Sequence, residues 1–160
     1  MKGAMADPPG EKGAQDGPVS DARLERFTGY LMKRAFNVVQ SDLARVLEPF
    51  GLRMLSFSTL MVVIDNPDIT QTQLAQALSV ERSNIVVVLD ALEEAGLLNR
   101  NPVPRNRRAY ALRATLAGQR LAEKASRAVA DHEARLFGGL SPGEHAVLRE
   151  ALGRLKATSG

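Results

Sequence analysis

Six arginines lie in a stretch of the chain that contains no acidic residue. They are Arg100, Arg105, Arg107, Arg108, Arg113 and Arg120. The nearest carboxylates on the two sides belong to Glu94 and Glu123. Arginines without acidic neighbours are suited to binding phosphate groups and to entering the narrow minor groove of duplex DNA. A segment that was merely soluble would carry acids among its arginines, so the pattern indicates contact with nucleic acid.

Residue types typical of catalysis are sparse. The two histidines, His132 and His145, fall on separate predicted helices and lack the spacing of metal ligands. The chain has no cysteine, which excludes disulfides, cysteine-ligated metal and oxidant sensing by a thiol. It has no GxGxxG motif, P-loop or nucleophile elbow. We therefore expect a protein that is not an enzyme and that holds no metal and no cofactor.

A short helix is predicted to begin at Thr70, ahead of the arginines. Thr70 and Gln73 match the S/T-x-x-E/Q capping box, and Ile69 and Leu74 stand at the positions of a hydrophobic staple. The apolar residues that follow at helical spacing are Leu74, Ala77 and Leu78. We expect them to form the buried face of this helix.

The second helix begins near Glu81, after a connection of only Ser79 and Val80. Its apolar residues at helical spacing are Ile85, Val88, Leu89 and Leu92. Gly96 follows as a C′ residue, where a positive φ carries no Cβ penalty. Two helices joined by so short a turn cross steeply, which is the geometry of a helix-turn-helix whose second helix can enter a DNA major groove.

A β-hairpin is predicted over the arginine-rich stretch, with strands at residues 97–100 and 107–113. The connection NPVPRN contains two prolines and two asparagines, which suits the tip of a hairpin and not a helix. Arg105, Arg107 and Arg108 lie at or next to this tip. We expect them to contact the DNA backbone and the minor groove.

The order of these elements, with the strings LAQALSV, LEEAGLLNR, NRR and LRATLAG, resembles the MarR family of bacterial winged helix-turn-helix regulators. The similarity covers about residues 24–156, and it is carried by the order and spacing of the strings together. The resemblance implies a homodimer that binds palindromic double-stranded DNA, usually as a repressor. It also implies release from the DNA by a small-molecule effector.

Candidate base contacts lie on the second, recognition helix. Arg82, Ser83 and Asn84 stand at its start, from which side chains reach base edges in the major groove. Val86 and Val87 stand where relatives often have Thr-Arg, so a base-reading arginine is absent there. The two valines could instead meet thymine methyl groups.

Candidate phosphate contacts are Thr70, Gln71 and Gln73, at the start of the first of the two helices. In the wing, Asn106 stands where many relatives carry an acidic residue before the paired arginines. An amide offers an arginine a weaker, neutral hydrogen bond than a carboxylate does. We therefore expect a mobile wing that becomes ordered on DNA.

Long helices are predicted on both sides of the helix-turn-helix, at residues 24–50, 116–137 and 141–156, with Ser20 or Asp21 as the first N-cap. A helix-turn-helix does not need them, so we assign them to the homodimer, with a buried interface above roughly 2,000 Å². The predicted fold is mainly α with a small β-hairpin. A winged helix-turn-helix domain at 51–114 is expected between helical dimerisation segments at 20–50 and 115–157.

Local signals define the two C-terminal helices. Thr115 is the predicted N-cap of the first, and Gly118 inside its first turns indicates close packing against another backbone. Ser141 and Glu144 form a capping box for the second. We expect His132 to pack between helices and His145 to be exposed.

The segment LRMLSFSTLMVVID, residues 52–65, is apolar nearly all round and should form a buried central helix. Arg53 and Ser56 are polar exceptions near its start. The resemblance places them, with Tyr30, beside a cleft that binds the effector, and an arginine there suits an anionic ligand such as an aromatic carboxylate or thioester. The plainer alternative is an exposed arginine and a tolerated serine.

The remaining composition sets broad bounds. The chain has 160 residues, 44% hydrophobic and 24% charged, which suits one domain or a small domain with a dimerisation arm. Residues 1–19, rich in Gly, Pro and charge, predict a disordered tail. The sequence has no run of 18 uncharged apolar residues and no signal-peptide pattern, so we expect a cytoplasmic protein that does not contact a membrane.

Two other functions compete with a ligand-released regulator. The first is a winged-helix DNA binder without an effector. The second is a protein-interaction module that keeps the fold but has lost DNA readout, which Val86 and Val87 slightly favour and the wing arginines oppose.

Overall fold

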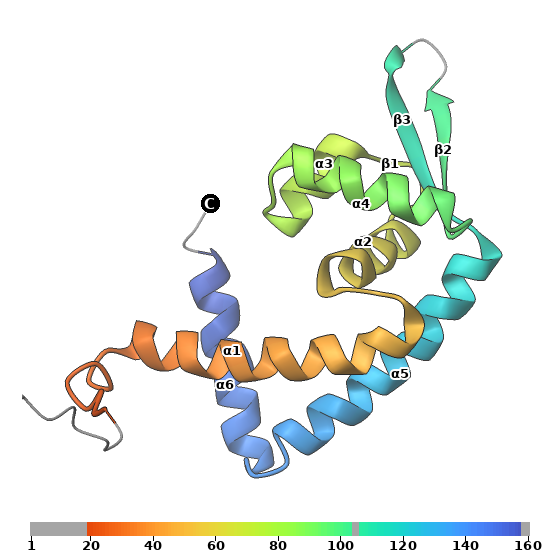
Figure 1. The fold of residues 1–160 in the computed structure, drawn as a ribbon. Helices are drawn as coiled ribbons and strands as arrows, with labels where there is room; N and C mark the ends of the chain where they lie inside the picture. Colours follow the sequence, from red (N-terminus) through yellow and green to blue (C-terminus); the bar gives the residue numbers. More distant parts are fainter. Residues whose placement is uncertain (1–18, 104–105, 158–160) are drawn as a thin grey trace, which may run out of the picture. The chain divides into compact units, whose positions relative to one another are not determined.

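The computed structural model describes residues 19–103 and 106–157, with side chains omitted at 103 and 106–109. It forms two compact units that divide between Arg34 and Ala35, within helix α1 (Thr28–Leu47). The second unit contains the 3₁₀ helix η1 (Glu48–Phe50) and most of the regular structure (Figure 1). The fold is mainly helical with one small antiparallel sheet, as the sequence predicts.

Helix α2 (Met54–Asp65) lies at the centre of the second unit. Its neighbours are α3 (Gln71–Leu78), α4 (Arg82–Glu94), the sheet and α5 (Leu116–Leu136) (Figure 1). Thr59, Leu60 and Val63 on α2 are at most 1% exposed. This confirms the prediction of a buried central helix.

The core around α2 draws on α1, α3, α4, α5, β2 and β3, which together with α2 form the DNA-binding lobe and its support. Its buried members outside α2 include Leu43, Leu47, Leu52, Leu74, Ile85, Leu89, Leu98, Leu112 and Ala125. Because fully burying such a side chain contributes on the order of 1.5–3 kcal/mol, this cluster is the main source of the lobe's stability. It provides a rigid support for the exposed faces of α3 and α4.

The sheet has three strands in the order β1-β3-β2. The hairpin of β2 (Leu98–Val103) and β3 (Asn106–Ala114) is the predicted one, and Arg100 stands opposite Leu112. The strand β1 (Ile69–Thr70) was not predicted; Ile69 pairs with Leu112 and Thr70 with Ala111. Two residues are too few to show the alternation by which a strand is recognised in a sequence.

The capping box at the start of α3 is confirmed. The backbone N–H of Gln73 donates to Thr70 Oγ1 at 3.3 Å, and the Thr70 N–H donates to Gln73 Oε1 at 3.0 Å. The predicted buried face is wrong at one position, because Ala77 is exposed and Ala75 is buried. Ala75 lies beside Leu74 on the side of the helix that faces the core.

The turns around α4 use left-handed backbone at two residues. Ser79 has φ 54° and ends α3, and the Val80 N–H donates to the Ala75 carbonyl oxygen at 3.0 Å. Gly96 has φ 68° after α4, as predicted, and the next N–H, of Leu97, donates to the carbonyl oxygen of Leu92 at 2.9 Å. This six-to-one bond is characteristic of a Schellman motif, and it turns the chain sharply into β2.

The start of α5 is joined to the end of α4. Thr115 Oγ1 accepts from the Gly118 N–H at 3.0 Å as an N-cap and donates to the Gly96 carbonyl oxygen at 2.8 Å. The Thr115 N–H donates to the Leu97 carbonyl oxygen at 3.1 Å. A Cβ at Gly118 would overlap that same oxygen, which confirms the predicted close approach of two backbones.

The first helix begins later than predicted. The N–H groups of Leu24 and Glu25 donate to the Asp21 carbonyl oxygen in turns, and regular helix starts only at Thr28. The Asp21 carboxylate accepts from the Tyr30 hydroxyl and from Arg34, so it is not available to cap a helix at residue 22. At its other end the helix stops at Leu47, where η1 begins.

Helix α6 (Pro142–Ala157) follows the predicted capping box. The Ser141 N–H donates to Glu144 Oε2 at 2.8 Å, and the Glu144 N–H donates to Ser141 Oγ at 3.3 Å. The prediction for His145 is wrong, because its ring is half-buried and stacks on Phe137 with centroids 5.6 Å apart. His132 on α5 is 5% exposed, which confirms its packing role.

Within the described ranges, no single helix is both long and apolar enough to cross a membrane.

Candidate nucleic-acid interface

Helix α4 has one face in the core and one face open to solvent. Ile85, Leu89 and Leu92 are at most 3% exposed and hold the helix against α2 and α3. At the start of the helix, Arg82, Ser83 and Asn84 are all exposed. The structure thus brings the predicted base-reading residues together on an accessible helix end with a rigid support behind it.

The two valines of α4 differ in exposure. Val87 is 69% exposed, whereas Val86 is half-buried and its carbonyl oxygen accepts a bond from the Arg100 guanidinium at 3.4 Å. A half-buried side chain cannot reach as far outward as one on the free face. Sequence reasoning treated the two as equivalent, because adjacent positions on a helix are separated only once its buried face is known.

The predicted phosphate contacts stand together at the N-terminus of α3. Thr70 and Gln73 use their side-chain oxygens in the capping box, which leaves the Gln73 amide nitrogen and the first backbone N–H groups of the helix for a ligand. Gln71 is half-buried at the first helical position. Helix N-termini favour anions because their N–H groups are unpaired and the helix dipole is positive there.

Arg100 corrects the interpretation of the six arginines as unpaired. Its side chain is only 17% exposed, and its guanidinium forms ion pairs with Asp90 and Glu93 of α4. Its backbone N–H donates to Glu93 Oε1 at 3.2 Å. The helix that precedes the hairpin supplies the missing acids, so Arg100 joins β2 to α4 and is not free to bind phosphate.

Arg113 is also paired, with an acid 45 residues away in the sequence. Its Nε donates to Asp68 Oδ1 at 2.6 Å, and its Nη2 bonds the second carboxylate oxygen. The hydrogen bonds from Arg113 hold the pKa of Asp68 below its usual range. Asp68 has φ 69°, so the pair also ties an unusual backbone conformation before β1 to the end of β3.

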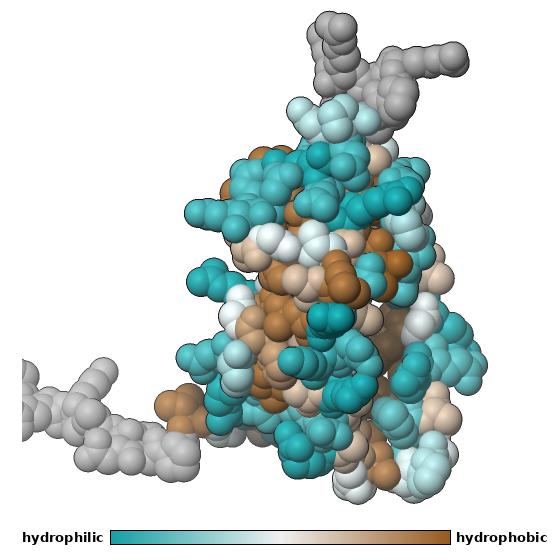
Figure 2. Space-filling model, turned by 90° about the vertical axis from the view of Figure 1, so that its right-hand side faces the viewer, coloured by the Kyte–Doolittle hydropathy of each residue, from teal (hydrophilic) through white to brown (hydrophobic). Residues whose placement is uncertain are grey.

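The wing arginines fall at the edge of the described structure. Arg105 lies outside it, and Arg107 and Arg108 are on the described backbone of β3 but their side chains are not described. The hairpin projects from the lobe beyond α4 (Figure 1). In Figure 2 the surface at this end of the lobe is mainly hydrophilic, and apolar side chains gather farther from the hairpin.

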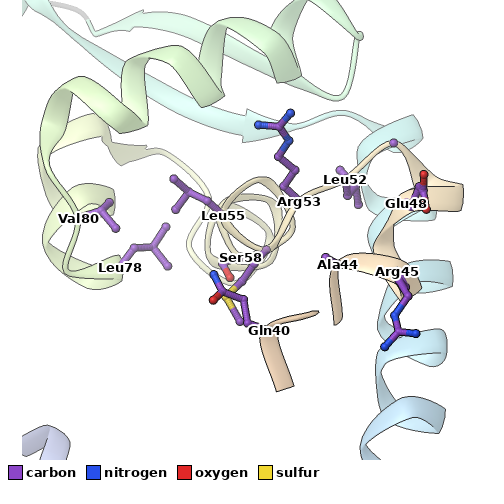
Figure 3. A pocket seen from close by; sticks show the side chains of 12 residues that line it. Gln40, Ala44, Arg45, Glu48, Leu52, Arg53, Leu55, Ser58, Leu78 and Val80 are labelled. Carbon is purple, nitrogen blue, oxygen red and sulfur yellow. The ribbon is translucent and has the colours of Figure 1, made fainter. Parts of the chain in front are cut away.

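A cavity of about 920 Å³ lies between α1, the start of α2 and the end of α3. Apolar residues that line it are Leu52, Met54, Leu55, Leu78 and Val80. Gln40, Arg45, Glu48, Arg53 and Ser58 provide polar groups (Figure 3). An apolar lining with a few polar groups is typical of a small-molecule site.

Of the three residues predicted to bind the effector, only Arg53 lines this cavity, whereas Ser56 and Tyr30 do not. Arg53 lines the cavity, and its side chain extends away from Gln40 and Ser58 (Figure 3). Ser58 lines the cavity but Ser56 does not, because Ser56 Oγ accepts from the Arg53 N–H at 2.8 Å and caps α2. Tyr30 belongs to the N-terminal unit, where its hydroxyl bonds Asp21.

Sequence reasoning missed Leu78 and Val80 as cavity residues. Leu78 was assigned to the core of the helix-turn-helix and Val80 to its turn. Both are half-buried, so each can serve the core and the cavity together. The sequence offered no separate signal for this second role.

The fold and these surfaces define a winged helix-turn-helix protein. The MarR family model matches residues 52–110. A protein of Thauera aromatica described as a putative transcriptional regulatory protein for the hcr operon is 36% identical over 99 residues. That match covers 62% of this chain and 60% of the Thauera protein's length.

Solved structures extend the similarity over most of the chain. The transcriptional repressor CouR, from Rhodococcus jostii RHA1, bound to a 23-mer DNA duplex is 33% identical, with a TM-score of 0.83 over 88% of this chain and 99% of CouR. CouR bound to p-coumaroyl-CoA is 31% identical, with a TM-score of 0.79 over 87% and 98% of the two chains. A transcriptional regulator of the MarR family from Rhodococcus sp. RHA1 is 30% identical, with a TM-score of 0.77 over 85% of this chain and 96% of that protein. The chain belongs to the MarR family, whose members are transcriptional regulators and not enzymes.

Proposed function

We propose that the chain is a dimeric repressor that binds palindromic duplex DNA and is released by an anionic aromatic effector. The observation that carries this proposal is the start of α4, where Arg82, Ser83 and Asn84 are exposed while Ile85, Leu89 and Leu92 bury the helix in the core. The MarR-family similarity and the DNA complex of CouR support it. A regulator of this kind acts where the chromosome lies, so we place it in the cytoplasm.

Each protomer of the dimer would place one α4 in a major groove. Successive major grooves on one side of a duplex are about 34–36 Å apart, so half-sites should lie about one turn apart. Thr70, Gln71 and Gln73 would hold phosphate through the N-terminus of α3. Arg105, Arg107 and Arg108 would reach the backbone and minor groove from the wing.

The dimer would use the helices outside the DNA-binding lobe. The large apolar residues exposed on α1 and α6 include Leu31, Phe36, Val38, Val147, Leu148, Leu152 and Leu155. Soluble monomers rarely leave so many apolar side chains uncovered. We assign these faces to a second copy of the chain.

The cavity between α1, α2 and α3 is the proposed effector site. Its apolar residues suit an aromatic acyl group, and Arg53 suits a carboxylate or the phosphates of a thioester carrier. CouR binds p-coumaroyl-CoA, which favours an aromatic CoA thioester here. Leu78 and Val80 join this cavity to the turn before α4, so a ligand that moves them would change how α4 is presented.

Selection of duplexes from a random pool tests DNA binding. The expected product is a palindrome with half-sites about one turn apart, and failure to enrich any sequence would overturn the proposal. Addition of aromatic CoA thioesters to the selected complex should release the protein, whereas free CoA should not. If the thioesters leave DNA binding unchanged, an effector-independent DNA binder is the better description.

A further inference from the structure

The direction in which each side chain of α4 points, relative to the core, follows from its position along the helix. An α-helix advances about 100° per residue. Measured from the mean direction of Ile85, Leu89 and Leu92, Val87 then points within about 15° of directly away from the core. Val86 points about a quarter turn to one side. Their exposure agrees, because Val87 is 69% exposed and Val86 is half-buried.

Val87, the residue that points most directly outward in the N-terminal half of α4, therefore presents no polar atom. Valine can neither donate a hydrogen bond to a base edge nor bind phosphate. In the major groove of unmodified DNA, the apolar group at the base edge is the C5 methyl of thymine. Ser83 lies one turn earlier on the same outward side, and it provides the neighbouring polar contact.

Charge limits how much of α4 can enter the groove. Asp90 and Glu94 follow Val87 on the outward side of the helix, and the Asp90 side chain is 59% exposed. Carboxylates repel DNA phosphate, and Arg100 compensates Asp90 and Glu93. The N-terminal half of α4 is thus the half that reads bases, and Val87 marks its last outward position.

We propose that Val87 determines specificity by packing against a thymine methyl in each half-site, and that Val86 does not contact the bases. This inference rests on the proposed DNA-binding function, and it adds the chemical group that is read. It predicts that binding depends on a methyl group in the DNA, independently of hydrogen bonding to that base pair.

Replacement of thymine by deoxyuridine isolates that group, because it removes the methyl and leaves the hydrogen-bonding pattern of the base pair unchanged. Full-length protein would be titrated against its selected duplex, with each symmetric pair of thymines replaced in turn. One buried methyl corresponds to about a fourfold change in affinity, and two half-sites together to about fifteenfold. We expect one thymine pair to give that loss with wild-type protein.

Two neighbouring variants make the test specific. Val87→Ala should bind the thymine duplex more weakly and should no longer distinguish it from the deoxyuridine duplex. Val86→Ala should distinguish the two duplexes as wild type does. Equal affinity of all three proteins for random DNA, with cooperative thermal unfolding, shows that both variants are folded.

The outcomes separate this inference from the function on which it rests. If wild type binds the selected duplex and no deoxyuridine substitution weakens it, methyl readout is refuted while DNA binding stands. If Val87→Ala keeps the full deoxyuridine effect, another residue reads the methyl and the assignment is overturned. If wild type selects no duplex, the proposed function itself fails.

Discussion

At the scale of single residues, Arg82 separates base recognition from general DNA affinity. It is the first residue of α4 and is exposed. We expect Arg82→Ala to weaken operator binding by about 1–3 kcal/mol and to relax the preference at one base pair, because a bidentate arginine contact discriminates bases by about that amount. Titration against single-base variants of the operator measures both effects.

Arg127 provides the matched control for Arg82. It is an exposed arginine on α5 that pairs with Glu123, and its replacement by Ala should leave sequence preference unchanged. An Arg82→Ala protein with the wild-type preference at every position would show that Arg82 does not read bases.

At Gly118, adding a single methyl group should destabilise the fold. A methyl group there would overlap the Leu97 carbonyl oxygen, and such overpacking typically costs about 1–3 kcal/mol. We expect Gly118→Ala to lower the free energy of unfolding in urea by that amount. Gly153→Ala on α6 meets nothing within 4 Å and should instead raise stability by up to about 1 kcal/mol.

Residue signals in the sequence succeeded where the structure depends on near neighbours. The capping boxes at Thr70 and Ser141 are hydrogen bonds between residues three positions apart, and the positive φ of Gly96 is a property of one residue at a helix end. The ion pairs of Arg100 and Arg113 were missed because their partners become neighbours only in the folded chain. Counting acids along the sequence therefore overestimated the number of free arginines.

At the scale of elements, Asp68 ties β1 to the end of β3 through Arg113. The bonds from Arg113 lower the pKa of Asp68 in the folded state. The pair thus stabilises the fold above the unfolded pKa of about 3.9, and this contribution is lost as pH falls through the folded value. Asp68→Asn should be less stable than wild type at pH 7, and the difference should shrink below about pH 4.

Urea unfolding of both proteins at the two pH values provides the measurement. Asparagine tolerates the left-handed backbone of this position, so the substitution tests the charge and not the turn. A difference of the same size at pH 7 and pH 3 would show that the ion pair is not its source.

The wing should contribute affinity with little sequence preference. Arg105→Ala combined with Arg107→Ala should weaken operator and random DNA by similar factors, because binding to phosphate carries no sequence information. The plot of log K against log salt should become less steep, and the magnitude of its negative slope should decrease by about 0.9 for each phosphate group that the variant no longer binds. Titrations at several salt concentrations decide this, and random-DNA binding at wild-type strength would exclude the wing as part of the DNA interface.

Element boundaries were harder to predict than element types. The first helix, for which Ser20 or Asp21 was the predicted N-cap, begins only at Thr28, and the Asp21 carboxylate is bound instead by Tyr30 and Arg34. Helix α2 is apolar nearly all round, so its sequence did not indicate which serine faces the cavity. The structure places Ser58 there and uses Ser56 as a cap.

At the scale of the whole molecule, the apolar face of α6 should decide the oligomeric state. Leu152 is 45% exposed among Val147, Leu148 and Leu155. A carboxylate in the centre of such a face would be buried without a partner in a dimer, which is strongly unfavourable. We expect wild type to be a dimer at micromolar concentration by light scattering, and Leu152→Glu to be a monomer.

As a control, Arg149→Glu introduces a glutamate on the polar side of α6, and it should leave the dimer intact. If wild-type protein were a monodisperse monomer, the assignment of these helices to a dimer would be wrong. The sequence indicated the surplus of apolar helix surface, but a single chain contains no information on the geometry of its partner.

The junction between α4 and α5 has a consequence for engineering chimeric regulators. The Thr115 hydroxyl and N–H bond the carbonyl oxygens of Gly96 and Leu97, and Gly118 leaves room for the second of these. A DNA-reading module transplanted from residues 52–114 would leave Thr115 and Gly118 behind. The recipient scaffold must then provide a hydroxyl and a glycine at the matching positions, or the seam should be moved beyond residue 118.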